Sequence, residues 1–281
     1  MSPRALAPSV PAAIAETPAS IAMADGTTLQ ARVYGRKRPG TVAPLVLHFH
    51  GGAFISGDLD SGARMARLLA QLDAVVVCVA YPLAPAHPFP QAVDAGYAAL
   101  EWTYKQRTKL AGAGAKVYLA GEEAGGNLAA AVAMVARDRG HPPLDGQVLV
   151  APMLDPCVGT ASVRERVAGA TCCKWADGWQ QYLRGPRDAE HPYAVPAHAT
   201  RLASLPPALV LTGQDDPMRD EALAYARRLG EAGIAVTTAV LAPTTGWPDS
   251  LVEETAPECP CEAGAKRHLH AFLYPATPPP S

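Results

Sequence analysis

A short apolar run at residues 45–49 is followed at once by the sequence HGGAF at residues 50–54. Consecutive glycines leave backbone N–H groups uncovered and let a substrate carbonyl approach the chain closely. Donors placed in this way stabilise the negative charge that develops on a carbonyl oxygen during acyl transfer. A tight turn after a strand would use the same residues, so the motif indicates an oxyanion hole only if a nucleophile accompanies it.

The second feature is a strand, a Gly-rich turn and a helix in immediate succession. An apolar strand is predicted at residues 117–120, and the sequence GEEAGGN at 121–127 leads into an Ala-rich helical stretch. This is the context of a nucleophile elbow, in which the residue at the tip of a sharp turn makes the attack. Glu123 occupies the tip here, and the expected oxyanion-hole donors are the N–H groups of Gly51, Gly52 and Ala124.

Together with two further motifs, these segments resemble the hormone-sensitive lipase family of α/β-hydrolase-fold carboxylesterases. The run YPLAPAHPFP at residues 81–90 is similar to the family's stretch between the oxyanion loop and the elbow, and DPMRDE at 216–221 is similar to its acid-bearing loop. The resemblance covers residues 45–273. It implies an α/β-hydrolase fold, with a mostly parallel central sheet and helices on both faces, and it assigns the acid position to Asp216.

The chain departs from the family pattern at the other two catalytic positions. The family's elbow resembles G-x-S-x-G, but Glu123 stands in place of the serine. The family's base lies in a His-Gly-Phe-like segment, which corresponds to PTTGW at 243–247 and puts Thr245 at the base position. Serine catalysis needs a hydroxyl and an imidazole that accepts its proton. We therefore expect serine-esterase activity to be absent or residual, and two coordinated changes in an altered loop favour natural divergence over engineered replacement.

Glu123 is expected at a helix N-terminus, where negative charge is favoured. We expect its carboxylate to fold into the oxyanion hole and stay ionised, so that the pocket repels carboxylates and accepts an amine or another cation. The chain would then be a pseudoenzyme that binds a small molecule, an ester or an amine. Plant gibberellin receptors, which resemble the same family, use the former active site in this way. The candidate pocket residues are His50, Phe54 and Trp247, with Trp175 and Trp179 as further aromatic candidates.

A second hypothesis keeps catalysis and makes Glu123 a carboxylate nucleophile or base. Epoxide hydrolases and dehalogenases of this fold attack with an aspartate at the equivalent turn. Those enzymes also need a base that drives water onto the ester intermediate, and Thr245 cannot serve as one near neutral pH. Glutamate is also one methylene longer than aspartate, which shifts the geometry of attack.

Strand-like and helical runs alternate along the chain. Strands are predicted at 29–34, 44–49, 74–80, 116–120, 147–151, 208–212 and 235–241, and helices at 62–71, 92–109, 127–137, 220–232 and 263–273. Buried strands separated by helices indicate a parallel sheet with both faces covered. One domain is expected over residues 21–281, with 155–207 as a possible lid-forming insertion. Residues 1–20 are expected to be a flexible N-terminal arm in place of the family's usual helical cap.

Composition limits the partners. The chain has 281 residues, 49% of them hydrophobic and 18% charged, with a formal net charge of −2. These values are typical of a globular protein and provide no basic surface for nucleic acid. We see neither a signal peptide nor a membrane-spanning run, so a cytoplasmic location with six reduced cysteines is expected. No cofactor or metal site is predicted, and a homodimer paired through the sheet edge is possible.

Overall fold

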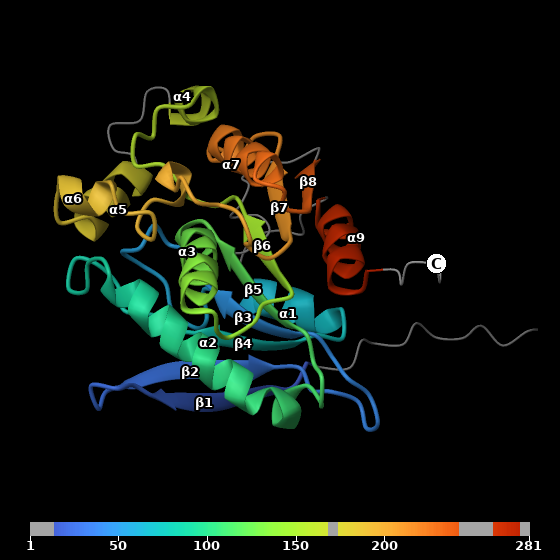
Figure 1. Ribbon diagram of the computed structural model, residues 1–281. Coiled ribbons are helices and arrows are strands. Elements are labelled where there is room, and N and C mark those ends of the chain that lie inside the picture. The colour runs from blue at the N-terminus through green and yellow to red at the C-terminus, as the bar shows by residue number, and fades with distance from the viewer. Residues whose placement is uncertain (1–13, 168–173, 242–260, 276–281) are drawn as a thin grey trace, which may run out of the picture.

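The computed structural model describes residues 14–167, 174–241 and 261–275. In these parts of the chain an eight-stranded sheet lies at the centre, in the order β1-β2-β4-β3-β5-β6-β7-β8 (Figure 1). Neighbours from β4 to β8 are parallel, whereas β1 and β2 join the end of the sheet in antiparallel pairs. The strands are β1 Glu16–Ala22, β2 Thr28–Tyr34, β3 Leu45–Phe49, β4 Val75–Val79, β5 Val117–Glu122, β6 Gly146–Val150, β7 Ala208–Gly213 and β8 Val236–Leu241.

Helices cover both faces of this sheet, which confirms the predicted fold class. The helices α1 and α9 contact each other on one face, while α2, α3 and α7 lie on the other (Figure 1). Strands β3 to β7 are fully buried, as a sheet covered on both faces requires. The bounds of these helices are α1 Ala63–Gln71, α2 Gln91–Leu110, α3 Ala124–Arg139, α7 Arg219–Glu231 and α9 Glu262–Leu273.

The expected N-terminal arm is shorter than the sequence predicted. Strand β1 begins at Glu16 and pairs along its whole length with β2, so residues 16–20 belong to the sheet. Pro18 hid this strand from the pattern, yet proline is tolerated in an edge strand, where one side of the backbone has no partner. Ile21 is buried in the core and anchors the strand.

The described part of the interval after β6 contains the short 3-10 helix η1 Pro196–His198 and three α-helices: α4 Ala161–Val167, α5 Lys174–Tyr182 and α6 Pro186–Ala189. The three α-helices gather beyond one end of the sheet (Figure 1). Helix α5 packs on the loop that follows β3, because a Cβ atom at Gly178 would lie 2.1 Å from the Ala53 carbonyl oxygen. The Phe54 ring stacks on Tyr182 of the same helix, with ring centroids 3.8 Å apart. This insertion therefore lies directly over the predicted oxyanion loop.

The described cysteines differ in their bonding. Cys78 and Cys157 are free, but Cys261 is disulfide-bonded. The expectation of six reduced cysteines is thus wrong for Cys261, because the sequence gives no measure of which sulfur atoms the fold brings together.

Among the described helices, none combines the length and the apolar character that crossing a bilayer demands.

Candidate functional site

Glu123 lies at the tip of a sharp turn between β5 and α3, as the sequence predicted. Its φ and ψ angles are 49° and −116°, a conformation that residues with a side chain rarely adopt. Two glycines permit the close approach of the backbone around this turn. A Cβ atom on Gly121 would lie 2.1 Å from the Gly125 carbonyl oxygen, and a Cβ atom on Gly125 would lie 2.0 Å from the Phe49 carbonyl oxygen. The turn therefore holds the Glu123 side chain in one place, at the carboxyl end of the central strand.

The Glu123 carboxylate folds back onto the oxyanion loop. The Gly52 N–H donates to Glu123 Oε2 at 3.1 Å, while Lys174 Nζ lies 3.0 Å from Glu123 Oε1. The Trp175 indole N–H donates to the same Oε1 atom at 3.4 Å. The side chain of Glu123 is only 4% exposed. One backbone donor, one ammonium group and one indole thus hold the carboxylate, and the α5 helix supplies two of the three.

The other two predicted donors behave differently. Gly51 donates its N–H to Glu122 Oε1 at 3.3 Å rather than to Glu123. Within the described residues, Ala124 forms no hydrogen bond with the Glu123 carboxylate. Of the three predicted oxyanion-hole donors, Gly52 alone donates a hydrogen bond to the Glu123 carboxylate. The two adjacent glycine N–H groups are therefore occupied by two adjacent carboxylates.

Glu122 forms a buried pair with His48 beneath this loop. His48 Nε2 lies 2.6 Å from Glu122 Oε2, and both side chains are at most 1% exposed. Burial opposes a charge on the ring, but the attraction of Glu122 and the contact with Cys78 outweigh it and raise the pKa of His48 to about 10. The ring is thus held as a cation, and it fixes the carboxylate that in turn receives the Gly51 N–H.

His50 braces the oxyanion loop from the other side. Its Nδ1 lies 2.7 Å from the Gly51 carbonyl oxygen, and its ring stacks on Tyr81 with centroids 4.3 Å apart. Tyr81 donates its hydroxyl to the His50 carbonyl oxygen at 2.8 Å. Burial lowers the pKa of His50, so the ring is neutral near pH 7. Phe54, expected to line the pocket, is 1% exposed and packs between Tyr182 and Trp179.

Asp216, at the predicted acid position, follows β7 and is fully buried. The Thr212 hydroxyl donates to Asp216 Oδ2 at 2.5 Å, and the Met218 N–H donates to Asp216 Oδ1 at 2.8 Å. Thr245 and Trp247, predicted as the base position and a pocket residue, lie outside the described residues. The structure therefore brings together the nucleophile position and the oxyanion loop, and it holds the acid in the loop that follows β7.

No imidazole stands beside the elbow carboxylate. All eight histidines belong to the described part of the chain, and none of them forms a hydrogen bond or an ion pair with Glu123 there. Lys174 is the charged group that the sequence reasoning missed. No local signal could have revealed it, because Lys174 comes from an insertion far along the chain and reaches Glu123 only when α5 packs on the oxyanion loop.

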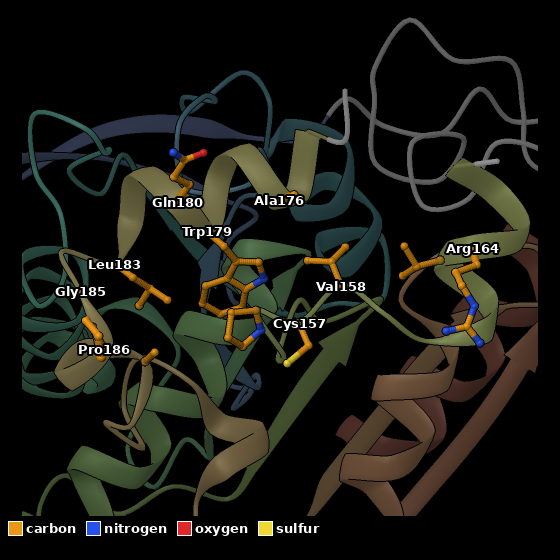
Figure 2. Close-up of a pocket in the computed structure, with 12 residues that line it drawn as sticks. Cys157, Val158, Arg164, Ala176, Trp179, Gln180, Leu183, Gly185 and Pro186 are labelled. Atoms are coloured by element: carbon orange, nitrogen blue, oxygen red, sulfur yellow. The ribbon is translucent and has the colours of Figure 1, made fainter. Parts of the chain in front are cut away.

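A cavity of about 720 Å³ lies next to this site, between α4, α5 and α6 (Figure 2). Its lining includes Trp179 of α5 and Leu183, which directly follows that helix, but neither Glu123 nor any glycine of the oxyanion loop. Trp179 was predicted as a candidate pocket residue, and it forms part of this wall. The first two residues of α5, Lys174 and Trp175, thus contact the elbow carboxylate, whereas Trp179 of the same helix lines a separate cavity.

Comparison with known proteins shows an α/β-hydrolase-fold chain that is similar to esterases. A family model described as alpha/beta hydrolase fold matches residues 46–245. The chain is 37% identical over 198 residues to the esterase LipI of Mycobacterium tuberculosis, a match that covers 69% of this chain and 62% of LipI. It is 35% identical over 225 residues to the carboxylesterase NlhH of the same species, covering 75% of this chain and 69% of NlhH.

Solved structures agree with these sequence matches. An esterase from Pyrobaculum calidifontis superposes with a TM-score of 0.81 at 34% identity, covering 92% of this chain and 84% of that one. A thermostable esterase from Pseudomonas putida gives a TM-score of 0.80 at 30% identity, covering 94% and 84%. Both values extend the likeness from the motifs to nearly the whole described chain.

Proposed function

Because the chain belongs to the α/β-hydrolase-fold family that includes carboxylesterases, we propose that it is a member without serine-esterase activity that binds a small molecule instead. The observation that carries the proposal is the hydrogen bond from the Gly52 N–H to Glu123 Oε2 at 3.1 Å. In an active esterase this N–H would face the oxyanion of a tetrahedral intermediate. Here a carboxylate of the protein itself occupies the donor.

The chemistry of the elbow supports the same proposal. A carboxylate at position 123 lacks the hydroxyl that forms an acyl-enzyme, and no histidine approaches it within the described residues to take up a proton. The negative charge of Glu123 also disfavours a second negative charge at the same donors. A substrate oxyanion would therefore have to displace a carboxylate that already forms the contacts it needs.

The sequence predicted an ester or an amine as the ligand. At the elbow, an amine would have to compete with a side chain of the protein itself. Lys174 Nζ already supplies the cation that the Glu123 carboxylate favours, at 3.0 Å. An external amine at the elbow would have to replace that ammonium group. The ligand therefore binds beside the elbow, which is closed because Gly52 and Lys174 already contact the Glu123 carboxylate.

Hydrolysis of short p-nitrophenyl esters tests the proposal. The parent protein, Glu123→Ser and the double variant Glu123→Ser with Thr245→His would be compared under identical conditions. We expect the parent to match the buffer rate, and the double variant to exceed it because the hydroxyl and the imidazole of the family pattern are restored. Rapid parental hydrolysis would contradict the proposal.

A carboxylate mechanism would give a different set of results. Parental hydrolysis that disappears in Glu123→Gln would indicate that the carboxylate itself reacts. Incubation with an epoxide in ¹⁸O-labelled water, followed by mass analysis of the peptide that contains Glu123, would detect label from an ester intermediate. We expect no label, because no histidine in the described residues is placed to direct water onto such an ester.

A further inference from the structure

The α5 helix separates the elbow from the cavity between α4, α5 and α6. Gly178 and Tyr182 pack against the oxyanion loop, whereas Ala176, Gln180 and Leu183 line the cavity. The cavity volume of about 720 Å³ falls within the range of roughly 300 to 1,000 Å³ that is typical of small-molecule sites. A ligand there would not have to open the contacts of Glu123.

The described lining is mostly apolar, with Gln180 and Arg164 as its hydrogen-bonding polar side chains besides Trp179. Figure 2 shows Leu183, Gly185 and Pro186 at one end of the cavity and Arg164 at the other, with Trp179 and Val158 between them. Among the described residues of this lining, Arg164 alone is charged. Within the described residues it donates to the Gly159 carbonyl oxygen and pairs with no carboxylate. The cavity therefore offers a mostly apolar surface that ends at an exposed cation without an acidic partner among the described residues.

Trp179 adds an aromatic surface to the wall. The residue is 3% exposed, and its indole N–H is buried without an acceptor among the described residues. Figure 2 shows the indole nitrogen on the side of the ring that faces Val158. Because the nitrogen atom itself is buried, the apolar surface of the ring, and not the donor, lines the cavity.

We propose that this cavity binds an aliphatic or aromatic monocarboxylate, whose apolar body lies along Trp179 and Leu183 and whose carboxylate faces Arg164. The inference rests on the proposed function, since a member that does not hydrolyse esters needs a ligand site away from its closed elbow. The two sites also differ in the cation that they offer. At the elbow the Lys174 ammonium group is already paired with Glu123, whereas Arg164 has no carboxylate partner among the described residues, so a carboxylate is directed to the cavity.

Calorimetry with three ten-carbon probes tests the proposal: decanoate, 1-decanol and decyltrimethylammonium. We expect decanoate to bind the parent best. Arg164→Gln should weaken decanoate binding by about threefold to tenfold, because it removes one charged hydrogen-bonding partner while it keeps the length of the side chain. The affinity for 1-decanol should stay unchanged. Arg187→Gln, on α6 but outside the lining, is the matched control for charge and should leave decanoate binding as in the parent.

Filling the cavity gives a second variant that does not depend on charge. Ala176→Trp places a large ring in the lining and should abolish binding of decanoate and of 1-decanol. Equal binding of the three probes by the parent, or equal weakening by Arg164→Gln and Arg187→Gln, would overturn the proposal. So would decanoate binding that Ala176→Trp leaves intact.

The elbow is the competing location, and Glu123→Gln distinguishes it. A carboxylate bound at the elbow would bind more tightly once the charge of Glu123 is removed, whereas one bound in the cavity should be unaffected. Ester hydrolysis by the parent would contradict the proposed function but leave decanoate binding at the cavity as a separate result. A parent that is silent toward esters and does not bind decanoate would overturn the inference alone.

Discussion

Replacing Glu122 by glutamine removes one charge from the buried pair beneath the oxyanion loop. Glutamine keeps the size of the side chain and an oxygen that can accept the Gly51 N–H, so the change is mainly electrostatic. His48 is fully buried, and its positive charge depends on the carboxylate 2.6 Å away. We expect Glu122→Gln to lower the free energy of unfolding at pH 7 and to change its pH dependence.

The magnitude follows from the distance and from the pKa. Two unit charges 2.6 Å apart attract by about 6 kcal/mol at an effective dielectric constant of about 20. Desolvation offsets part of this attraction, and breaking a buried pair at one partner typically costs about 3–5 kcal/mol. The pKa of His48 rises from 6.5 in the unfolded chain to about 10 in the folded protein.

The sign of the pH effect follows from these two values. Below pH 6.5 both states bind the proton, and the contribution of His48 to stability is fully present. Between 6.5 and about 10 the unfolded state loses its proton while the folded state keeps it, so stability falls as pH rises. The slope is at most about 1.4 kcal/mol per pH unit, which gives a loss of about 3 kcal/mol from pH 7 to pH 9.

Urea unfolding followed by circular dichroism at pH 7, 8 and 9 measures both effects. The parent should lose stability across this range, and Glu122→Gln should begin lower and stay nearly constant, so that the two converge toward pH 9. Glu16→Gln is the matched control: its carboxylate pairs with Arg67 at a half-exposed site, so it should cost less than about 1 kcal/mol and leave the pH slope unchanged. If the two proteins had the same free energy of unfolding at pH 7, or if the difference were the same at all three pH values, the assigned role of the charge on Glu122 would be refuted.

Two further substitutions test how α5 is held over the oxyanion loop. Gly178→Ala should lower the free energy of unfolding by about 1–3 kcal/mol in urea titrations, because its Cβ atom would lie 2.1 Å from the Ala53 carbonyl oxygen. Gly230→Ala, also within a helix but with nothing within 4 Å, should instead raise it by up to about 1 kcal/mol, and a loss of the same size in both would contradict the packing argument. Phe54→Ala should cost about 3–5 kcal/mol, since the ring is 1% exposed and stacks on Tyr182 at 3.8 Å; a cost below about 1 kcal/mol would show that this contact does not anchor the helix.

The features that the sequence predicted well are local in the chain. Residues 117–122 form a buried strand, the glycines at 121 and 125 allow a turn of very close approach, and an Ala-rich helix begins at Ala124. Apolar periodicity and glycine placement depend on neighbouring residues only. They therefore also predicted the alternation of strands and helices that builds the covered sheet. Strand β1 escaped because short side chains and Pro18 mask its alternation, and only its partner β2 reveals it.

The tertiary structure decided which charges meet. The pair of His48 and Glu122 joins residues 74 positions apart, and the contact of Trp175 with Glu123 spans 52 positions. A sequence pattern reports the period of a segment but not the direction or distance of its side chains after packing. The carboxylate at the elbow and its turn toward Gly52 could therefore be predicted from residue order, whereas its pairing with Lys174 and the cavity on the other side of α5 exist only because the insertion folds onto the oxyanion loop.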